Sequence, residues 1–240
     1  MIALQCRRCN HSWTPRIKRP VMCPRCHSPF WDRDRQQRAG KLVQSISNPE
    51  SKYGLDAVAS ALNRMVRDRL IKGWVIYGSV AHSLWAVPLT TMDVDVLVPV
   101  KNDLEYTRAL SAMATASNGF SSGGFALRIA DVRVEVFPAN VGPLYEAAFH
   151  DAAKMKTSAG EPVLVVRPEY LALMAVAAWR FDPIRGVDDR QRAQNLIALG
   201  LCDMGKMQEL TDQYADTFPR IEETEFRRRV AAVLEPRPQD

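Results

Sequence analysis

The chain has 240 residues, of which 47% are hydrophobic and 25% charged, and its formal net charge at pH 7 is +5. This composition excludes a disordered chain, a collagen and a coiled coil, and it leaves room for one domain with a sizeable core beside a small module. Residues 1–41 hold ten basic and two acidic residues, a balance of +8, whereas the other 22 basic and 25 acidic residues balance to −3.

The cysteines are concentrated in the same basic N-terminal segment. Two Cys-x-x-Cys motifs, separated by thirteen residues, contain four of the five cysteines, namely Cys6, Cys9, Cys23 and Cys26. No signal-peptide pattern and no apolar run of membrane-helix length stand out, so we expect a cytoplasmic protein with reduced thiols and no membrane partner. Four thiolates supply the tetrahedral ligand set that Zn²⁺ prefers, and so short a segment needs the metal in order to fold.

Residues 4–35 resemble the zinc ribbons of the rubredoxin-like kind. Because four thiolates already fill the tetrahedral site, we expect His11 and His27, which follow the two motifs, not to bind the metal. Aromatic residues interleaved with arginine and lysine could stack on nucleic acid and neutralise it, namely Trp13, Phe30 and Trp31. The alternative is a solvated basic face around a small core made of these aromatic side chains.

The next expected elements are a helix, a strand and a second helix. Apolar residues at helical spacing predict the first helix from about Leu55 to Leu70. Residues 74–77 predict a short buried strand that runs directly into Gly78-Ser79 and the second helix. Glycine lets the backbone approach a ligand closely, and the N–H groups at a helix start attract anions, so a phosphate-binding turn is indicated. The alternative is a tight turn without a ligand.

Acidic and apolar residues alternate over residues 93–98, Asp-Val-Asp-Val-Leu-Val. In a strand, residues two apart face the same side, so Asp93 and Asp95 project together while the valines project into the core. Neighbouring carboxylates on a strand repel each other. Such a pair is typical of a site for divalent cations, and Mg²⁺ prefers carboxylates together with substrate phosphates.

Tyr77-Gly78-Ser79, a thirteen-residue spacer and the strand with both aspartates together resemble the signature of the polymerase-β-like nucleotidyltransferase superfamily. The resemblance implies that Gly78 and Ser79 bind the nucleotide phosphates and that Asp93 and Asp95 hold catalytic Mg²⁺. It also implies a third carboxylate on a neighbouring strand. Residues 131–137 alternate in the required way, and within them we favour Glu135 over Asp131 as that metal ligand.

Within the superfamily, the chain is most similar to the AbiEii-type toxins and related minimal nucleotidyltransferases. Ala81, Thr91 and both aspartates match their motif region, whereas Leu89 stands where these proteins have arginine. Residues 163–171 resemble their strand leading into Pro-Glu-x-Leu and a helix, but the lysine of that helix and a Lys-Asp-x-x-Asp motif are missing. We therefore expect Thr91 to contact the nucleotide. In place of the lysine we expect Arg180 to contact it, with Arg185, Arg190 and Lys156 as alternatives.

The patterns together predict an α/β (α+β) fold, with a polymerase-β-like nucleotidyltransferase core, a mixed sheet and a C-terminal helical lobe behind a small zinc ribbon. A final helix is expected from about Glu222 to Leu234, and its Arg227–Arg229 run is typical of a solvated helix face, with nucleic-acid binding as the alternative. The expected domains are 1–40 (ribbon with basic tail), 41–55 (linker), 56–165 (core) and 166–240 (helical lobe).

The expected activity is transfer of a nucleoside monophosphate from an NTP to an acceptor hydroxyl, with Mg²⁺ as catalytic cofactor, Zn²⁺ as structural metal and release of pyrophosphate. The AbiEii resemblance implies a tRNA 3′ end as acceptor and a cognate antitoxin as partner, and other relatives modify proteins or antibiotics. Two alternatives remain. One is an inactive adaptor or antitoxin with the same fold, and the other is a zinc-ribbon regulator that binds nucleic acid.

Overall fold

The computed structural model describes residues 3–6, 11–14, 49–86, 91, 93–117, 126–179, 183–218 and 221–235, without the side chains of 49–53 and 183–188. The chain divides into two compact units, Met1–Ser51 and Lys52–Asp240. The expected domain boundaries after residues 40, 55 and 165 are finer than this division and stay predictions.

The described part of the first unit is a small antiparallel hairpin of β1 (Leu4–Gln5) and β2 (Ser12–Trp13). The backbone N–H of Cys6 donates a 2.8 Å hydrogen bond to the carbonyl of His11, which closes the loop between the strands. The Cys6 side chain is buried. Cys9, Cys23 and Cys26 lie outside the described residues, so the zinc site remains a prediction.

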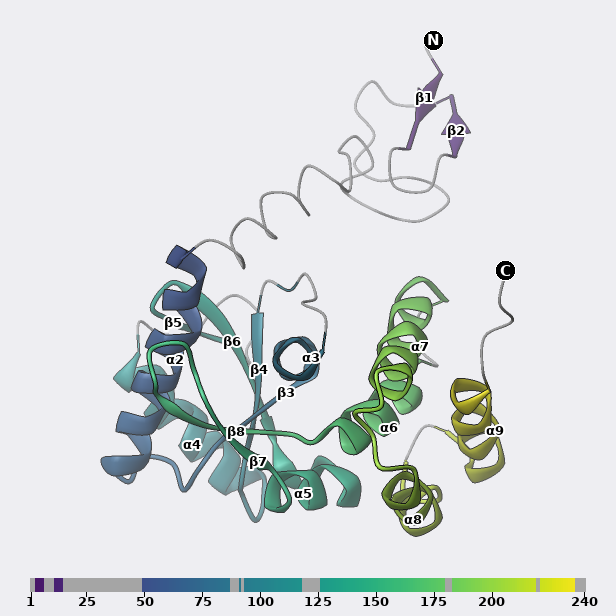
Figure 1. The fold of residues 1–240 in the computed structure, drawn as a ribbon. Coiled ribbons are helices and arrows are strands. Elements are labelled where there is room, and N and C mark those ends of the chain that lie inside the picture. Colours follow the sequence, from purple (N-terminus) through teal and green to yellow (C-terminus); the bar gives the residue numbers. More distant parts are fainter. Residues whose placement is uncertain are drawn as a thin grey trace. The chain divides into compact units, whose positions relative to one another are not determined.

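The second unit is built on one mixed six-stranded sheet (Figure 1). The strand order is β5-β6-β4-β3-β8-β7, in which β4–β6 and β3–β8 pair in parallel and the other neighbours pair antiparallel. The strands are β3 (Val75–Tyr77), β4 (Asp93–Val98), β5 (Ala126–Ile129), β6 (Val132–Pro138), β7 (Ala153–Lys156) and β8 (Pro162–Val165). The predicted α/β fold with a mixed sheet is therefore confirmed.

Because side chains alternate along β4 and β6, one face of these strands packs in the core and the other face carries the residues predicted for the site. Val94 and Val96 of β4, with Val134 and Val136 of β6, are buried on one face of the sheet. The residues between them face the other side, where they are only partly buried or exposed. The Tyr106 hydroxyl of α4 (Asp103–Ala116) donates a 2.6 Å hydrogen bond to the Val136 carbonyl of β6.

The helices of the second unit lie around the sheet and in a lobe beside it (Figure 1). Those of the sheet part are α2 (Pro49–Arg67), α3 (Gly78–Trp85), α4 (Asp103–Ala116), the 3₁₀ turn η1 (Ala139–Val141) and α5 (Pro143–His150). Those of the lobe are α6 (Pro168–Ala178), α7 (Pro183–Ala198), α8 (Met204–Tyr214) and α9 (Glu223–Leu234). The described residues include no helix long and apolar enough to cross a membrane.

Helix α6 is the centre of the lobe, because nine of its eleven residues are buried. It packs against α3, α5, α7, α8 and α9. The buried Glu169 side chain accepts a 2.8 Å hydrogen bond from the N–H of Asp203, immediately before α8. The lobe thus contacts the sheet part through α3 and α5.

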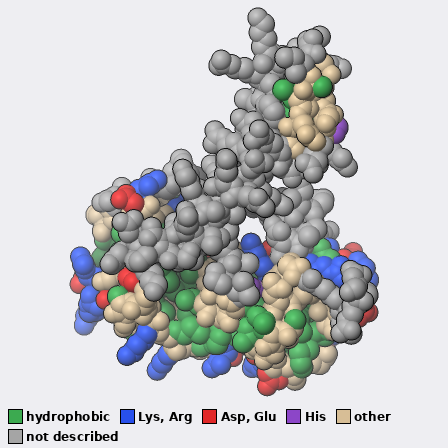
Figure 2. All heavy atoms as spheres, turned by 45° about the horizontal axis from the view of Figure 1, so that its top comes forward, with side chains coloured by type: hydrophobic (Ala, Val, Ile, Leu, Met, Phe, Trp, Pro, Cys, Tyr) green, Lys and Arg blue, Asp and Glu red, His purple; other side chains and the backbone are tan. Residues whose placement is uncertain are grey.

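The arginines of α9 form ion pairs with neighbouring acidic side chains. Arg227 pairs with Glu223 and Asp212, and both Arg228 and Arg229 pair with Glu225. Figure 2 likewise shows basic and acidic side chains interspersed over the visible face of the second unit. These contacts favour an ion-paired helix face over nucleic-acid binding for this arginine run, in which Arg229 is largely buried against the Trp179 ring.

Candidate active site

The sheet register brings the predicted carboxylates together. Asp95 of β4 lies opposite Glu135 of β6 on one side and opposite Tyr77 of β3 on the other, and Asp93 lies opposite Arg133. Strands in a sheet are about 4.8 Å apart, so side chains at opposite positions are direct neighbours on one face. Asp93, Asp95 and Glu135 therefore share one face of the sheet, opposite to the face on which the valines are buried.

The Asp95 carboxylate lies against the first turn of α3. The backbone N–H of Ser79 donates a hydrogen bond to it. Gly78 has φ +67°, and a Cβ at this position would lie 2.2 Å from Asp95 Oδ2. Only glycine combines this backbone conformation with so close an approach. The predicted phosphate-binding turn is thus also the support of one of the two aspartates.

Negative charge accumulates at Asp95 without full compensation. Burial raises the pKa of the Asp95 carboxyl from its ordinary value of 3.8 to about 7, and the charges of Asp93 and Glu135 add to this effect. The Arg192 guanidinium and the Ser79 N–H act in the opposite direction but are weaker. Such a carboxylate is stabilised by any cation that reaches it.

Each of the other two carboxylates already has a polar partner. The Thr91 hydroxyl donates a 2.8 Å hydrogen bond to Asp93 Oδ1 and lies 3.1 Å from the Asp93 carbonyl oxygen. Arg133 donates a hydrogen bond from Nη2 to Glu135 Oε1 and forms an ion pair with it. Thr91, expected at the nucleotide, therefore orients Asp93.

The carboxylates of Asp93, Asp95 and Glu135 meet the requirements of a divalent cation only in part. Among the described residues, no group of three or more His, Cys, Asp or Glu side chains is arranged to hold a metal ion. Asp93 and Asp95 are hard oxygen donors of the kind that Mg²⁺ prefers, and the charge of Asp95 is not compensated by its neighbours. Glu135 has to leave Arg133 before it can join them.

Arg192 of α7 is a residue of this site that the sequence patterns did not single out. Its guanidinium lowers the pKa of Asp95, and it lies 3.4 Å from Asp189. Its backbone carbonyl accepts a 3.3 Å hydrogen bond from Nε2 of His82, a buried residue of α3. Its only signal in the sequence is its place in the stretch 188–192, Asp-Asp-Arg-Gln-Arg, where the AbiEii-type toxins that the chain resembles have Lys-Asp-x-x-Asp.

Tyr77 forms an aromatic boundary of the site. Its ring makes edge-to-face contacts with Phe137, at 5.5 Å between centroids, and with Tyr145 of α5, at 6.4 Å. Burial and the charge of Asp95 raise the pKa of the Tyr77 hydroxyl above its ordinary range, so it stays protonated. The tyrosine consequently shields one side of Asp95 from water.

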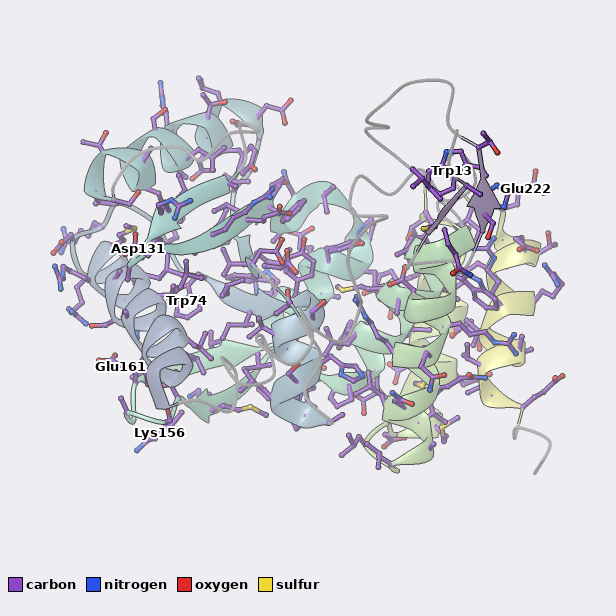
Figure 3. All side chains as sticks on the ribbon, turned by 90° about the horizontal axis from the view of Figure 1, so that it is seen from above. Trp13, Trp74, Asp131, Lys156, Glu161 and Glu222 are labelled. Atoms are coloured by element: carbon purple, nitrogen blue, oxygen red, sulfur yellow. The ribbon has the colours of Figure 1, made fainter. Side chains whose placement is uncertain are left out.

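Several other candidates lie elsewhere. Asp131 is an exposed turn residue with φ +64° and not a strand residue, because the turn between β5 and β6 takes it out of the alternation. Figure 3 labels it at this turn, immediately before β6. Arg190 lies over the ring of Trp179, at 5.3 Å, and reaches a carbonyl of α9. Lys156 is on β7, at the edge of the sheet. Arg180 lies outside the described residues.

Two solved structures resemble the chain in fold. One is an antigenic nucleotidyltransferase-like protein from Paracoccidioides brasiliensis, with 15% identity, a TM-score of 0.48 and coverage of 76% of this chain and 89% of that one. The other is ANT(2″)-Ia in complex with adenylyl-2″-tobramycin, with 15% identity, a TM-score of 0.43 and coverage of 75% and 99%. No protein-family model and no curated protein matches the sequence. The function proposed below therefore rests on the residues of the site.

The close contact at Gly78 predicts a specific cost of substitution. Gly78→Ala adds a Cβ 2.2 Å from Asp95 Oδ2, whereas Gly200 has the same φ of +67° and no atom within 4 Å of an added Cβ. Gly200→Ala should lower the free energy of unfolding by about 1 kcal/mol, the cost of the backbone conformation alone. Gly78→Ala should lower it by about 2–4 kcal/mol in chemical denaturation. Equal losses of stability in the two variants would contradict the close contact between Gly78 and the Asp95 carboxylate.

The raised pKa of Asp95 predicts a pH-dependent stability. Between the ordinary value of 3.8 and about 7, the folded chain keeps a proton that the unfolded chain has lost, so this stabilisation disappears as the pH rises through about 7. Asp95→Asn removes the charge with little change of shape. In EDTA it should raise Tm by about 2–6 °C at pH 8 and by less than half as much at pH 5, where the folded carboxyl is still protonated. The same increase at both pH values would show that charge is not the cause.

Proposed function

We propose that the protein transfers a nucleoside monophosphate from an NTP to an acceptor hydroxyl and releases pyrophosphate. The observation that carries the proposal is the placement of Asp93 and Asp95 on one sheet face, directly beside the Gly78–Ser79 turn. Carboxylates with uncompensated charge and an anion-attracting helix start are then in contact. A metal-bound polyphosphate is the ligand that satisfies both.

The residues of the chain have distinct tasks in this reaction. The N–H groups at the start of α3 and the Arg192 guanidinium are the groups that attract the phosphates of the NTP. Asp93, oriented by Thr91, and Asp95, supported by Ser79, would hold Mg²⁺, with Glu135 as the third ligand once it leaves Arg133. The metal would lower the pKa of the acceptor hydroxyl and offset charge on the leaving pyrophosphate.

The chemical step is a single displacement at the α-phosphorus. The acceptor oxygen forms a bond to this phosphorus, and the bond from it to the oxygen bridging to the β-phosphorus breaks. Pyrophosphate leaves with that bonding pair, and the acceptor proton passes to solvent. Positioning and charge stabilisation are sufficient, and no side chain has to form a covalent intermediate.

The aspartates can be tested with matched substitutions. The full chain is incubated with labelled NTPs, Mg²⁺ and total RNA or lysate, and labelled products are separated on gels. Asp93→Asn and Asp95→Asn should each reduce labelling at least a hundredfold, since each removes metal charge from the reacting phosphate. Asp131→Asn, at the exposed carboxylate outside the strand, should label like wild type. No labelling by wild type, or labelling that survives both changes, would refute the reaction.

The second candidate function is an adaptor that binds nucleotide, RNA or a partner without turnover. It is favoured by the Arg133–Glu135 ion pair, which occupies a carboxylate oxygen that a third metal ligand would need. Calorimetry with Mg²⁺-NTP separates the two functions, because an adaptor binds without releasing pyrophosphate. A tRNA 3′ end as acceptor and a cognate antitoxin as partner, both implied by the AbiEii resemblance, belong to the first function as further proposals.

We also propose that Cys6, Cys9, Cys23 and Cys26 hold one structural Zn²⁺ in the first unit. The supporting observation is the hairpin, in which a hydrogen bond from Cys6 to His11 closes the loop that contains Cys9, and in which the Cys6 side chain is buried.

The zinc proposal predicts a change in metal content. Cys6→Ser should reduce the zinc of the purified full chain from one ion per chain to a small fraction, because three thiolates bind the ion far more weakly than four. Cys202→Ser, at the buried cysteine of the helical lobe, should keep the full amount. Metal analysis by mass spectrometry measures both variants. Zinc retained by Cys6→Ser, or lost equally by both, would contradict the ligand set.

A further inference from the structure

His82 of α3 is a buried titratable side chain to which the proposed reaction gives no task. The residue is 2% exposed, and its Nε2 lies 3.3 Å from the backbone carbonyl oxygen of Arg192 in α7. The other ring nitrogen, Nδ1, is buried and has no hydrogen-bond partner among the described residues. One nitrogen of the ring therefore contacts α7, and the other is left unsatisfied.

The Arg192 carbonyl determines which nitrogen of His82 carries the proton. A carbonyl oxygen only accepts hydrogen bonds, so Nε2 is the donor and Nδ1 holds the lone pair. Burial lowers the pKa of the His82 imidazole below its ordinary value of 6.5, which keeps the ring neutral at pH 7. A neutral imidazole has a single N–H group, and in His82 this group points at the Arg192 carbonyl.

Stability alone does not favour a histidine at this position. A buried nitrogen without a partner costs free energy, and an apolar side chain of similar size would avoid that cost. The Arg192 carbonyl lies inside α7, where the N–H four residues further on is its helical partner. The carbonyl thus does not need His82 in order to be satisfied. What the hydrogen bond provides is a fixed attachment of α7 to α3.

This attachment lies between two contacts of the candidate active site. The Ser79 N–H, in the first turn of α3, donates to the Asp95 carboxylate, and His82 follows one turn later in the same helix. Helix α3 packs against α7 (Figure 1). There the Arg192 guanidinium acts on Asp95 and lies 3.4 Å from the Asp189 carboxylate. Arg192 is thus held at its backbone by His82 and at its guanidinium by Asp189.

The backbone of Arg192 needs this second support because its side chain is long and has many rotamers. The side chain is also partly exposed, so packing alone does not fix it. A rotation of α7 about its axis would carry the guanidinium away from Asp95. The hydrogen bond from His82 opposes such a rotation at the residue concerned.

Resting on the proposed function, we propose that His82 is a positioning residue for the NTP: its hydrogen bond to the Arg192 carbonyl fixes α7 so that the Arg192 guanidinium contacts the phosphates beside Asp95. Helix α3 then arranges both cationic parts of the phosphate site. It supplies the N–H groups of its own first turn, and through His82 it places the guanidinium of α7. His82 itself is buried and acts only through Arg192.

The experiment measures binding of inorganic triphosphate with Mg²⁺ to the full chain by calorimetry. This probe has no base, so no NTP has to be chosen. Salt at about 0.15 M weakens interactions with the basic first unit. Arg192→Gln should weaken binding about tenfold, the loss expected for one charge-assisted contact. His82→Leu should weaken it about threefold to tenfold, because the guanidinium is still present but no longer held in place.

Two amide side chains separate the hydrogen bond from the filling of space. The amide nitrogen of glutamine can take the place of Nε2, whereas asparagine carries the same group on a side chain one methylene shorter. His82→Gln should therefore bind triphosphate like wild type, and His82→Asn should bind it as weakly as His82→Leu. This pair keeps the test valid if the leucine variant does not fold. Equal binding by the two amide variants would overturn the inference.

A double variant shows whether His82 acts through Arg192. In the Arg192→Gln background, His82→Leu should weaken binding by less than about twofold, because the guanidinium to be positioned is absent. A merely structural role would multiply the two losses, which would also overturn the inference. Thr211→Val removes a buried hydroxyl that donates to a carbonyl elsewhere in the lobe, at Met207 of α8, and should leave binding unchanged. Weakening by Thr211→Val equal to that by His82→Leu would count against a specific role.

Failure of the inference and failure of the proposed function give different results. If triphosphate binding depends on His82 as expected but no NTP labels any product, the positioning holds and the reaction is wrong. If label is transferred while His82→Leu leaves the KM for NTP unchanged, the inference is wrong and the function holds.

Discussion

The contact between Asp95 and the Gly78–Ser79 backbone is the constraint on which the rest of the site depends. It attaches β4 to the first turn of α3 and requires glycine at φ +67°. The backbone N–H of Ser79 only partly offsets the burial of the carboxylate and its repulsion by Asp93 and Glu135. The fold therefore retains a carboxylate that destabilises it, and a bound cation is what would make this arrangement favourable.

The same contact joins the helical lobe to the sheet. The first turn of α3 lies against Asp95. Further along the same helix, buried His82 donates a hydrogen bond to the Arg192 carbonyl of α7. The Arg192 side chain then acts electrostatically back on Asp95. The lobe is held by the largely buried helix α6. Packing far from the site thus determines where a positive charge faces the carboxylates.

The strands of the site were predictable because their pattern is local. Alternation with period two placed Asp93 and Asp95 on one face, and the same alternation in β6 indicated Glu135. Asp131 was not separable from Glu135 by pattern alone, since its left-handed turn conformation depends on the pairing of β5 with β6. Arg192 was not predictable, because the rotation of α7 about its axis is set by packing against α3 and α6. The Arg133–Glu135 ion pair likewise depends on side-chain geometry within one strand.

The charges of the site are arranged in three zones, with the carboxylates in the middle. Arg192 and the start of α3 lie on one flank, and Arg133 and Arg128 lie on the other. In the proposed reaction, a metal-bound NTP would lie over the carboxylates, between these two groups of arginines. The sheet register keeps Arg133 and Arg128 on one flank, and the packing of α7 keeps Arg192 on the other.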